Sequence, residues 1–210
     1  MPDDPTPSPP PKRRGRPPAG GREAILDATL ALLRERGVAR LTTREVADRA
    51  GVSEASVYYH YTDKAGLLQA VFQHGLEPLQ VFGQRGAGED EGDAGDVMAR
   101  LARAIEQSLD VVLPVLMAAQ SDVELRDALS AYMKAQNLGP HRGIELLARR
   151  IATEQQAGRM RDDVDPASAA ILLVGAAYLR SSQRQIMGKN LRPLPSLDGI
   201  VATLETLLAR

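Results

Sequence analysis

The sequence predicts an all-α protein of about nine helices, and three observations support this prediction. Apolar residues recur at helical spacing almost throughout residues 21–209, and no segment sustains the alternation of a β-strand. The chain has five Tyr, two Phe and no Trp, so its core must consist mainly of Leu, Val, Ile, Ala and Met, which favours helices. Capping residues, glycines and prolines stand at the ends of the periodic segments.

Residues 1–20 are the exception to this pattern. They hold eight of the 14 prolines and no periodic apolar residues, so we expect a disordered arm. The arm has a basic tip, Lys12-Arg13-Arg14-Gly15-Arg16-Pro17.

The first helix is expected over 21–37, where Ile25, Ala28 and Leu32 lie on one stripe and Gly37 ends the helix. A capping box, Thr42-Thr43-Arg44-Glu45, begins the second: the Thr42 hydroxyl can accept a hydrogen bond from the Glu45 amide.

The second helix ends at Gly51-Val52-Ser53, and Ser53 can cap a short third helix that reaches Tyr61. Segments 43–50 and 54–61 therefore form a predicted helix-turn-helix, in which Gly51 supplies the unusual turn dihedral.

A long fourth helix is expected from about Asp63, with Pro78 kinking or ending it. Residues 83–96 are rich in Gly, Asp and Glu but lack the alternating spacing of a calcium loop, so we predict a solvated loop and no metal site. Capping signals at Ser121-Asp122-Val123-Glu124 and Asp165-Pro166 and a stop at Gly158 divide the remainder. Five further helices are expected at 95–118 (with Pro114 inside), 122–136, 140–157, 166–187 and 197–209.

Composition excludes several classes of protein. The absence of cysteine excludes a disulfide scaffold, thiol catalysis and cysteine-ligated zinc or iron–sulfur clusters. No apolar run approaches the roughly 20 residues that span a bilayer, and the N-terminus has no signal-peptide stretch, so we expect a cytoplasmic protein without a membrane partner. The three histidines have no HExxH spacing or nearby Asp pair, and no glycine-rich phosphate loop is present, so we predict neither an enzyme nor a cofactor.

The formal net charge of −1 conceals a local asymmetry. Residues 12–68 hold 11 Lys/Arg against 7 Asp/Glu, a net charge of +4, and the rest of the chain is negative. A basic N-terminal third indicates a local site for a polyanion.

Three aromatic residues and a histidine follow one another at Tyr58-Tyr59-His60-Tyr61 on the third helix. Four consecutive helical residues point in different directions and cannot all be buried, so some of these rings must be exposed. They lie on the element that would enter the major groove of DNA, where hydroxyl and imidazole groups can reach phosphates.

Together these residues resemble the TetR family of bacterial transcriptional regulators over about 50 residues. The residues that support the resemblance are Ile25, Ala28, Gly37, Leu41-Thr42-Thr43, Val46-Ala47, Ala50-Gly51-Val52-Ser53, Val57-Tyr58-Tyr59-His60-Tyr61, Lys64 and Leu67-Leu68.

The resemblance implies a homodimer of nine-helix, TetR-like subunits that binds a pseudo-palindromic operator in double-stranded DNA and is released by a small-molecule effector. It divides the chain into the arm (1–20), a three-helix DNA-binding domain (21–66) and a C-terminal ligand-binding and dimerisation domain (67–210). The DNA-binding residues it implies in the folded domain are Thr43, Arg44, Ser53, Glu54, Ala55, Ser56, Tyr58, Tyr59, His60 and Lys64.

Three of these expectations have alternatives. Glu54 either accepts a hydrogen bond from cytosine N4 or only favours the helix N-terminus electrostatically. The Tyr58 ring either contacts DNA or packs partly on the first helix. Arg14-Gly15-Arg16-Pro17 resembles the core of an AT-hook, in which Arg14 and Arg16 lie in an A·T minor groove, but a basic tail that binds phosphates without reading sequence fits equally.

In such a fold the ligand cavity lies among the middle helices, although each candidate lining residue also fits an ordinary core. Few rings are available to stack a planar compound, which favours an apolar, flexible effector. The candidates are Met98, Leu101, Ile105, Leu109, Leu113, Met117, Tyr132, Met133, Leu147, Ile151 and Tyr178.

Helix 166–187 is rich in alanine and apolar nearly all round, so it must be covered on both sides, and it is expected to pair with helix 197–209 in an isologous dimer. A wholly internal core helix is the alternative. The expected interface residues are Ala170, Val174, Ala177, Leu197, Val201 and Leu204.

A DNA-binding structural factor that senses no ligand is a rival function, but dimerisation alone would not need so large a C-terminal domain. The sequence leaves the operator, the effector, the regulated genes and the choice between repressor and activator open.

Overall fold

The computed structural model describes residues 21–84, 94–187 and 192–210. Within these ranges the chain is helical and has no β-strand beyond an isolated bridge between Met160 and Ala209, so the all-α class is confirmed. The basic arm, with Arg14 and Arg16, and most of the acidic loop fall outside the described residues. None of the described helices is both long and apolar enough to cross a membrane.

Ten α-helices are present in the described residues, where the sequence predicted about nine. The extra one arises because the long fourth helix ends at Gly75, with Leu76 as its C-cap, and a new helix begins at Glu77, so Pro78 lies in a first turn. The elements are α1 (Gly21–Arg36), the 3-10 helix η1 (Val38–Arg40), α2 (Thr43–Ala50), α3 (Glu54–Tyr61), α4 (Lys64–Gly75), α5 (Glu77–Gln84), α6 (Ala94–Ala119), α7 (Val123–Ala135), α8 (Pro140–Gln156), α9 (Pro166–Met187) and α10 (Leu197–Leu208).

The helix starts follow the capping signals closely. The Thr42 and Ser53 hydroxyls each accept the amide three residues ahead, at 3.2 Å in both cases. Asp165 caps α9 through the Ser168 amide at 2.7 Å. The predicted second capping box is corrected by one residue: α7 is capped by Asp122, which accepts the Leu125 amide at 3.0 Å, and not by Ser121.

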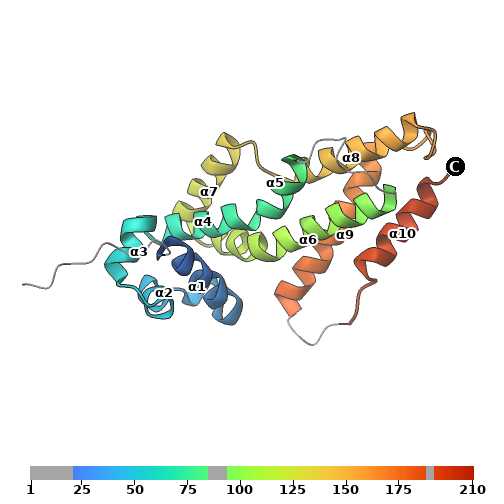
Figure 1. Ribbon diagram of the computed structural model, residues 1–210. Helices are drawn as coiled ribbons and strands as arrows, with labels where there is room; N and C mark the ends of the chain where they lie inside the picture. The colour runs from blue at the N-terminus through green and yellow to red at the C-terminus, as the bar shows by residue number, and fades with distance from the viewer. Residues whose placement is uncertain (1–20, 85–93, 188–191) are drawn as a thin grey trace, which may run out of the picture.

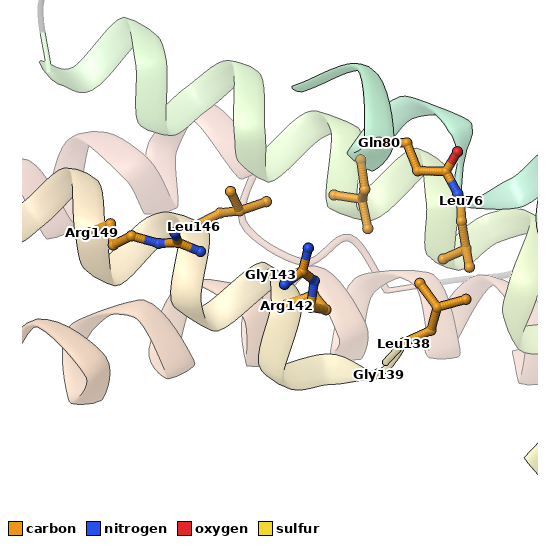
Figure 2. Close-up of a pocket in the computed structure, with 9 residues that line it drawn as sticks. Leu76, Gln80, Leu138, Gly139, Arg142, Gly143, Leu146 and Arg149 are labelled. Atoms are coloured by element: carbon orange, nitrogen blue, oxygen red, sulfur yellow. The ribbon is translucent and has the colours of Figure 1, made fainter. Parts of the chain in front are cut away.

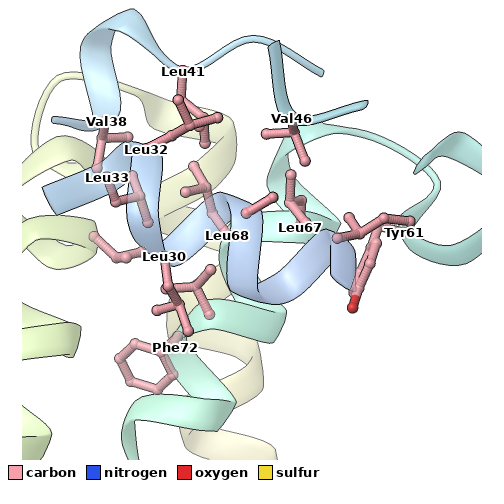
Figure 3. Close-up of a cluster of buried hydrophobic side chains, with 14 of the residues drawn as sticks. Leu30, Leu32, Leu33, Val38, Leu41, Val46, Tyr61, Leu67, Leu68 and Phe72 are labelled. Carbon is pink, nitrogen blue, oxygen red and sulfur yellow. The ribbon is translucent and has the colours of Figure 1, made fainter. Parts of the chain in front are cut away.

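α1–α3 lie at one end of an elongated molecule, and α8 and α10 lie toward the other (Figure 1). One apolar cluster, the head core, joins α1–α4 to the C-terminal half of α6 and to α7, so its packing continues past residue 66. Figure 3 labels ten of its residues: Leu30, Leu32, Leu33, Val38, Leu41, Val46, Tyr61, Leu67, Leu68 and Phe72.

A second apolar cluster, the body core, joins the N-terminal half of α6 to α8, α9 and α10. Helix α6 takes part in both clusters: Met98 and Ile105 belong to the body core, whereas Val112 and Val115 belong to the head core. Ser108 lies between these two sets on the same helix, at the seam between the cores.

Pro114 lies inside α6, close to this seam. Because proline has no backbone N–H, the carbonyl of Asp110 loses its usual helical donor. The side-chain amide of Gln185, on α9, donates to that carbonyl at 3.3 Å. Arg184 also pairs with the Asp110 carboxylate at 2.8 Å, so α9 compensates the interruption and fastens itself to α6.

Candidate DNA-binding surface and ligand cavity

The turn between α2 and α3 depends on Gly51. Its backbone adopts the left-handed conformation (φ 68°, ψ 29°), which side chains other than glycine rarely allow. The next amide, that of Val52, donates to the Ala47 carbonyl at 3.0 Å and closes the turn. The predicted helix-turn-helix is therefore present, with α3 starting three residues after the turn glycine and Ser53 as its cap.

The aromatic residues of α3 divide into an inner and an outer group. Tyr61 is buried, and its hydroxyl donates to the Arg22 carbonyl of α1 at 2.8 Å. Burial raises the pKa of Tyr61, which keeps the hydroxyl in its donating form. Tyr59, in contrast, is 79% exposed and Tyr58 48% exposed. The inner ring fixes α3 to the domain and leaves the outer rings on the surface.

The exposed end of α2 is connected to α3 by a small polar network. The Thr43 hydroxyl donates to a Glu54 carboxylate oxygen at 2.6 Å. The same hydroxyl lies 3.2 Å from the Tyr58 hydroxyl. Glu54 and Tyr58 are exposed, so these contacts fix their positions on the surface without burying them. The sequence predicted each of these residues singly but not the network that joins them.

His60 lies less openly than its neighbours. Its Nε2 atom is buried, has no hydrogen-bond partner within the described part of the chain, and faces Gly21 at the start of α1. The ring meets Tyr59 edge-on, with centroids 5.1 Å apart. In this arrangement Nε2 does not face solvent, so His60 supports Tyr59 more than it offers a group to a ligand.

Lys64 is the first residue of α4 and is exposed. Asp63 caps this helix by accepting the Gly66 amide at 2.7 Å. A Cβ atom on Gly66 would lie 2.3 Å from the Tyr61 carbonyl oxygen, so only glycine lets α4 begin this close to the end of α3. Lys64 is thus an exposed cation three residues after the end of α3, at Tyr61.

The other predicted DNA-binding residues in the described chain also lie at or near this surface. Arg44, Ser53 and Ala55 are exposed, while Thr43 and Ser56 are half-buried. The hydroxyls of Ser53 and Ser56 lie 2.9 Å apart and are used within the helix start.

A cavity of about 140 Å³ lies at the seam between the head core and the body core. Four of the predicted ligand residues line it: Ile105, Leu109, Met133 and Tyr178. Sequence reasoning missed the contributions of α4 and α5, because nothing in their periodicity distinguishes a cavity wall from a core. The residues lining the cavity are Phe72, Leu76, Leu79, Ile105, Ser108, Leu109, Val112, Leu116, Met133, Leu138, Gly139, Pro140, Gly143, Val174 and Tyr178.

The other predicted ligand residues are not among those lining this cavity. Tyr132 packs edge-on against the Phe72 ring, at 6.2 Å between centroids, and Met117 is 40% exposed. The remainder are buried core residues. The sequence could not exclude them, because helical periodicity does not distinguish a residue that lines a cavity from one that packs in the core. They are Met98, Leu101, Leu113, Leu147 and Ile151.

A second hollow of about 360 Å³ adjoins the cavity and shares Leu76, Leu79, Leu138, Gly139 and Gly143 with it. Figure 2 shows Arg142 and Arg149 of α8 on one side of this hollow, and Leu76 and Gln80 on the other.

Most of the residues predicted for the dimer interface are covered within their own subunit. Ala170, Ala177, Leu197, Val201 and Leu204 are buried in their own subunit. Val174 lines the cavity. Which face of a helix is exposed depends on where the neighbouring helices pack, and the sequence of that helix does not show where they pack. The exposed large hydrophobic residues of the same two helices are Ile171, Leu172, Tyr178, Leu179, Ile186, Met187 and Leu207.

Similarity in sequence to known proteins is found in the N-terminal domain. Residues 25–71 match the family described as bacterial regulatory proteins, tetR family. The chain is 42% identical over 50 residues to the class D tetracycline repressor protein of Escherichia coli, a stretch that covers 24% of this chain and 23% of that protein. It is 34% identical over 80 residues to the HTH-type transcriptional regulator TtgR of Pseudomonas putida, covering 38% of each chain. The matched stretches thus span well under half of these relatives.

The fold similarity extends further. A TetR family transcriptional regulator from Pseudomonas syringae pv. tomato superposes with a TM-score of 0.57 at 21% identity, covering 90% of this chain and 95% of that one. The predicted resemblance to the TetR family is therefore confirmed: in sequence over the helix-turn-helix domain, and in fold over most of the chain.

Proposed function

We propose that this chain, whose N-terminal segment is a TetR-family helix-turn-helix domain, is a ligand-responsive transcriptional repressor. It acts as a homodimer on a pseudo-palindromic operator in bacterial cytoplasm, and a small molecule releases it. The observation that carries the proposal is the exposed edge formed by Tyr59 and Lys64, held in place by the buried Tyr61 and by the close α3–α4 approach.

The DNA contacts follow from the exposed groups. α3 enters the major groove with Ala55 toward the base edges, where a short side chain lets the backbone approach closely. Tyr58, Tyr59 and Lys64 reach phosphates beside the groove. Arg44, exposed on α2, adds a second cation to the same side.

A second copy of the chain is the partner that suits the exposed faces of α9 and α10. Leu172 is 67% exposed and Leu207 62% exposed, and Ile171 and Leu179 extend the apolar surface along α9. An isologous pairing of these faces would cover them and set the separation of the two α3 helices. That separation must be roughly 34–36 Å for both to enter successive major grooves.

Helix α4 provides the coupling between ligand and DNA. Its N-terminal part carries Lys64 and contributes Leu67 and Leu68 to the head core, while Phe72 and Leu76 at the other end line the cavity. A ligand that favours a shifted α4 changes the separation of the recognition helices. It releases DNA only if it binds that shifted state more tightly than the DNA-binding state.

The test is operator binding by Tyr59→Ala and Lys64→Ala, with operators selected from genomic fragments by the wild-type protein. Both variants are expected to lose most operator affinity while keeping the dimer mass and the melting temperature of the wild type. Arg126→Ala is the matched control, because Arg126 is an exposed residue of α7 far along the chain from this surface. Loss of the dimer in the Tyr59 or Lys64 variant would assign those residues to the fold instead.

The arm has its own test, since Arg14 and Arg16 lie outside the described residues. Deleting residues 1–18 should weaken operator binding and lower its salt dependence. A larger loss on operators with A·T-rich flanks supports the minor-groove hypothesis, whereas an equal loss on G·C-rich flanks supports a basic tail that reads no sequence.

A further inference from the structure

We propose that the effector is an amphipathic carboxylate, with its apolar body in the cavity at the seam and its carboxylate in the adjoining hollow beside Arg142 and Arg149. The inference rests on the proposed function and specifies the chemistry of its ligand. Three features of the two hollows support it.

The first feature is the size and lining of the inner cavity. Most of its walls are aliphatic or aromatic side chains, and no Asp, Glu, Lys or Arg is among the residues that line it. Its volume of about 140 Å³ compares with the ~150 Å³ apolar cavity that accommodates a benzene molecule in a well-studied protein. An apolar body of about six to eight carbon atoms therefore fits, and a charged group would be costly to bury there.

The second feature is the charge of the outer hollow. Arg142 and Arg149 are both exposed and both lie 3.7 Å from the same partner, the carboxylate of Glu145. Two guanidinium groups thus share one carboxylate, and no Asp or Glu is among the residues that line either hollow. The excess positive charge suits an anion, and the planar guanidinium group matches the geometry of a carboxylate.

The connection between the hollows determines the order of groups on the ligand. Leu76, Leu79 and Leu138 belong to the walls of both, together with two glycines of the α8 region. A single molecule that spans these shared residues has its apolar end among the uncharged walls of the cavity and its charged end beside Arg142 and Arg149.

The third feature is Ser108, which lines the inner cavity and is 3% exposed. Its hydroxyl has no hydrogen-bond partner among the described residues. A buried hydroxyl without a hydrogen-bond partner costs folding free energy, and a wholly apolar ligand would leave this hydroxyl without a partner. We therefore expect the apolar body to carry an uncharged hydrogen-bonding group, such as a hydroxyl, that pairs with Ser108.

The experiment measures binding to the full-length protein by isothermal titration calorimetry with three probes that share one body: 3-phenylpropanoate, 3-phenylpropanol and 3-phenylpropylamine. The carboxylate is expected to bind about tenfold more tightly than the amine, with the alcohol between them. Replacing both arginines (Arg142→Gln with Arg149→Gln) should lower carboxylate affinity about tenfold and leave alcohol affinity unchanged. Arg126→Gln is the matched control and should change neither.

Two further measurements examine the inner cavity. Val174→Phe, which fills the cavity, should weaken all three probes together. The 4-hydroxy derivative of 3-phenylpropanoate should bind several-fold more tightly than the parent acid, and Ser108→Ala should remove that advantage. An advantage that persists in Ser108→Ala would remove Ser108 from the site.

The proposal is overturned if the amine or the alcohol binds as tightly as the carboxylate, if none of the probes binds, or if the double arginine variant binds the carboxylate like the wild type. These failures would leave the proposed function standing wherever wild-type operator binding persists. Conversely, carboxylate binding by a protein that selects no genomic fragment would support the site and contradict the proposed regulator.

Discussion

The ion pairs that join α1 to α2 lie in solvent, whereas the C-terminal part also contains ion pairs around a buried carboxylate and partly buried ones between α6 and α9. Arg36–Glu45 and Arg49–Glu35 join α1 to α2 with every side chain at least 37% exposed. In the C-terminal part, Glu154 is 1% exposed between two arginines. Exposed ion pairs contribute little to the free energy of unfolding and tolerate substitution. A buried charge, in contrast, requires its partners, because removing one of them leaves the charge uncompensated.

The two regions also differ in the sequence separation of their contacts. The caps that start α2, α3 and α4 each join residues three apart. The contacts that fasten α9 to α6 join residues more than 70 apart, such as Arg180 and Glu106, whose charged atoms lie 2.8 Å apart. The helix starts of the N-terminal domain are thus set locally, whereas the C-terminal part is assembled from distant segments.

The largest effect is expected when a leucine is shortened to alanine, and the comparison is between a site in the head core and a site at the seam. Leu67 is fully buried in the head core, and Leu67→Ala should lower the free energy of unfolding by about 2–5 kcal/mol. Leu109 is half-buried and lines the cavity, so Leu109→Ala removes fewer contacts and should cost about 1–2 kcal/mol. Chemical denaturation of both variants gives the comparison, and equal losses would contradict a loosely packed seam.

The second test concerns the buried carboxylate of Glu154. A hydrogen bond from Arg159 at 2.5 Å, together with the charges of Arg150 and Arg159, holds its pKa below the usual range despite burial. A lowered pKa in the folded state contributes stability above the unfolded pKa of about 4.3, and this contribution is lost as the pH falls through the folded value.

Glu154→Gln should therefore lower the free energy of unfolding at pH 7 by about 1.5–3 kcal/mol, the range for hydrogen bonds to charged groups. The difference from the wild type should shrink as the pH falls below about 4.3. Urea denaturation over a pH series measures this, and a difference independent of pH would show that the charge of Glu154 is not what stabilises the fold.

The third test returns to the exposed polar network of the N-terminal domain. Glu54→Gln removes a negative charge beside the DNA, so affinity for a non-operator duplex should rise by about two- to fivefold at low salt. Thr43→Val breaks the same hydrogen bond but keeps the charge, and it should not raise that affinity. Fluorescence anisotropy at two salt concentrations separates the effects; a fall in operator affinity confined to Glu54→Gln would favour base reading by Glu54.

The smallest effect is expected for the exposed pair of Arg36 and Glu45. Arg36→Ala should change the free energy of unfolding by less than about 1 kcal/mol, because the pair is solvated and screened by salt. Thermal denaturation in low and high salt checks the value. A loss as large as that of Glu154→Gln would remove the distinction between the two regions.

Local interactions explain which parts of the structure could be predicted from the sequence. The turn at Gly51, the caps at Thr42 and Ser53 and the start of α4 were all predicted, since each depends on residues a few positions apart. An interruption at Pro78 was also predicted, as a kink or an end of the fourth helix, but the separate helix α5 was missed because Pro78 is compatible with either a kink or a new first turn.

The cavity and the interface faces could not be predicted in the same way. Ile105 and Leu147 both lie on apolar helical stripes, but only Ile105 lines the cavity, while Leu147 is packed in the body core. On α9, Ala170 is covered by its own subunit and Leu172 is exposed, although both are apolar. Periodicity identifies the apolar face of a helix and cannot say which neighbour covers it.

The sequence by itself determined the all-α class, the helix-turn-helix and the basic, aromatic character of its surface, because capping, turn formation and charge are properties of short segments. Only the tertiary structure decided that Tyr61 turns inward while Tyr59 turns outward, that α4 extends from the DNA-binding surface to the cavity, and that Ser108 lies unpartnered at the seam. Each of these depends on which distant helices pack together, and packing between distant segments is not encoded in the spacing of residues along one of them.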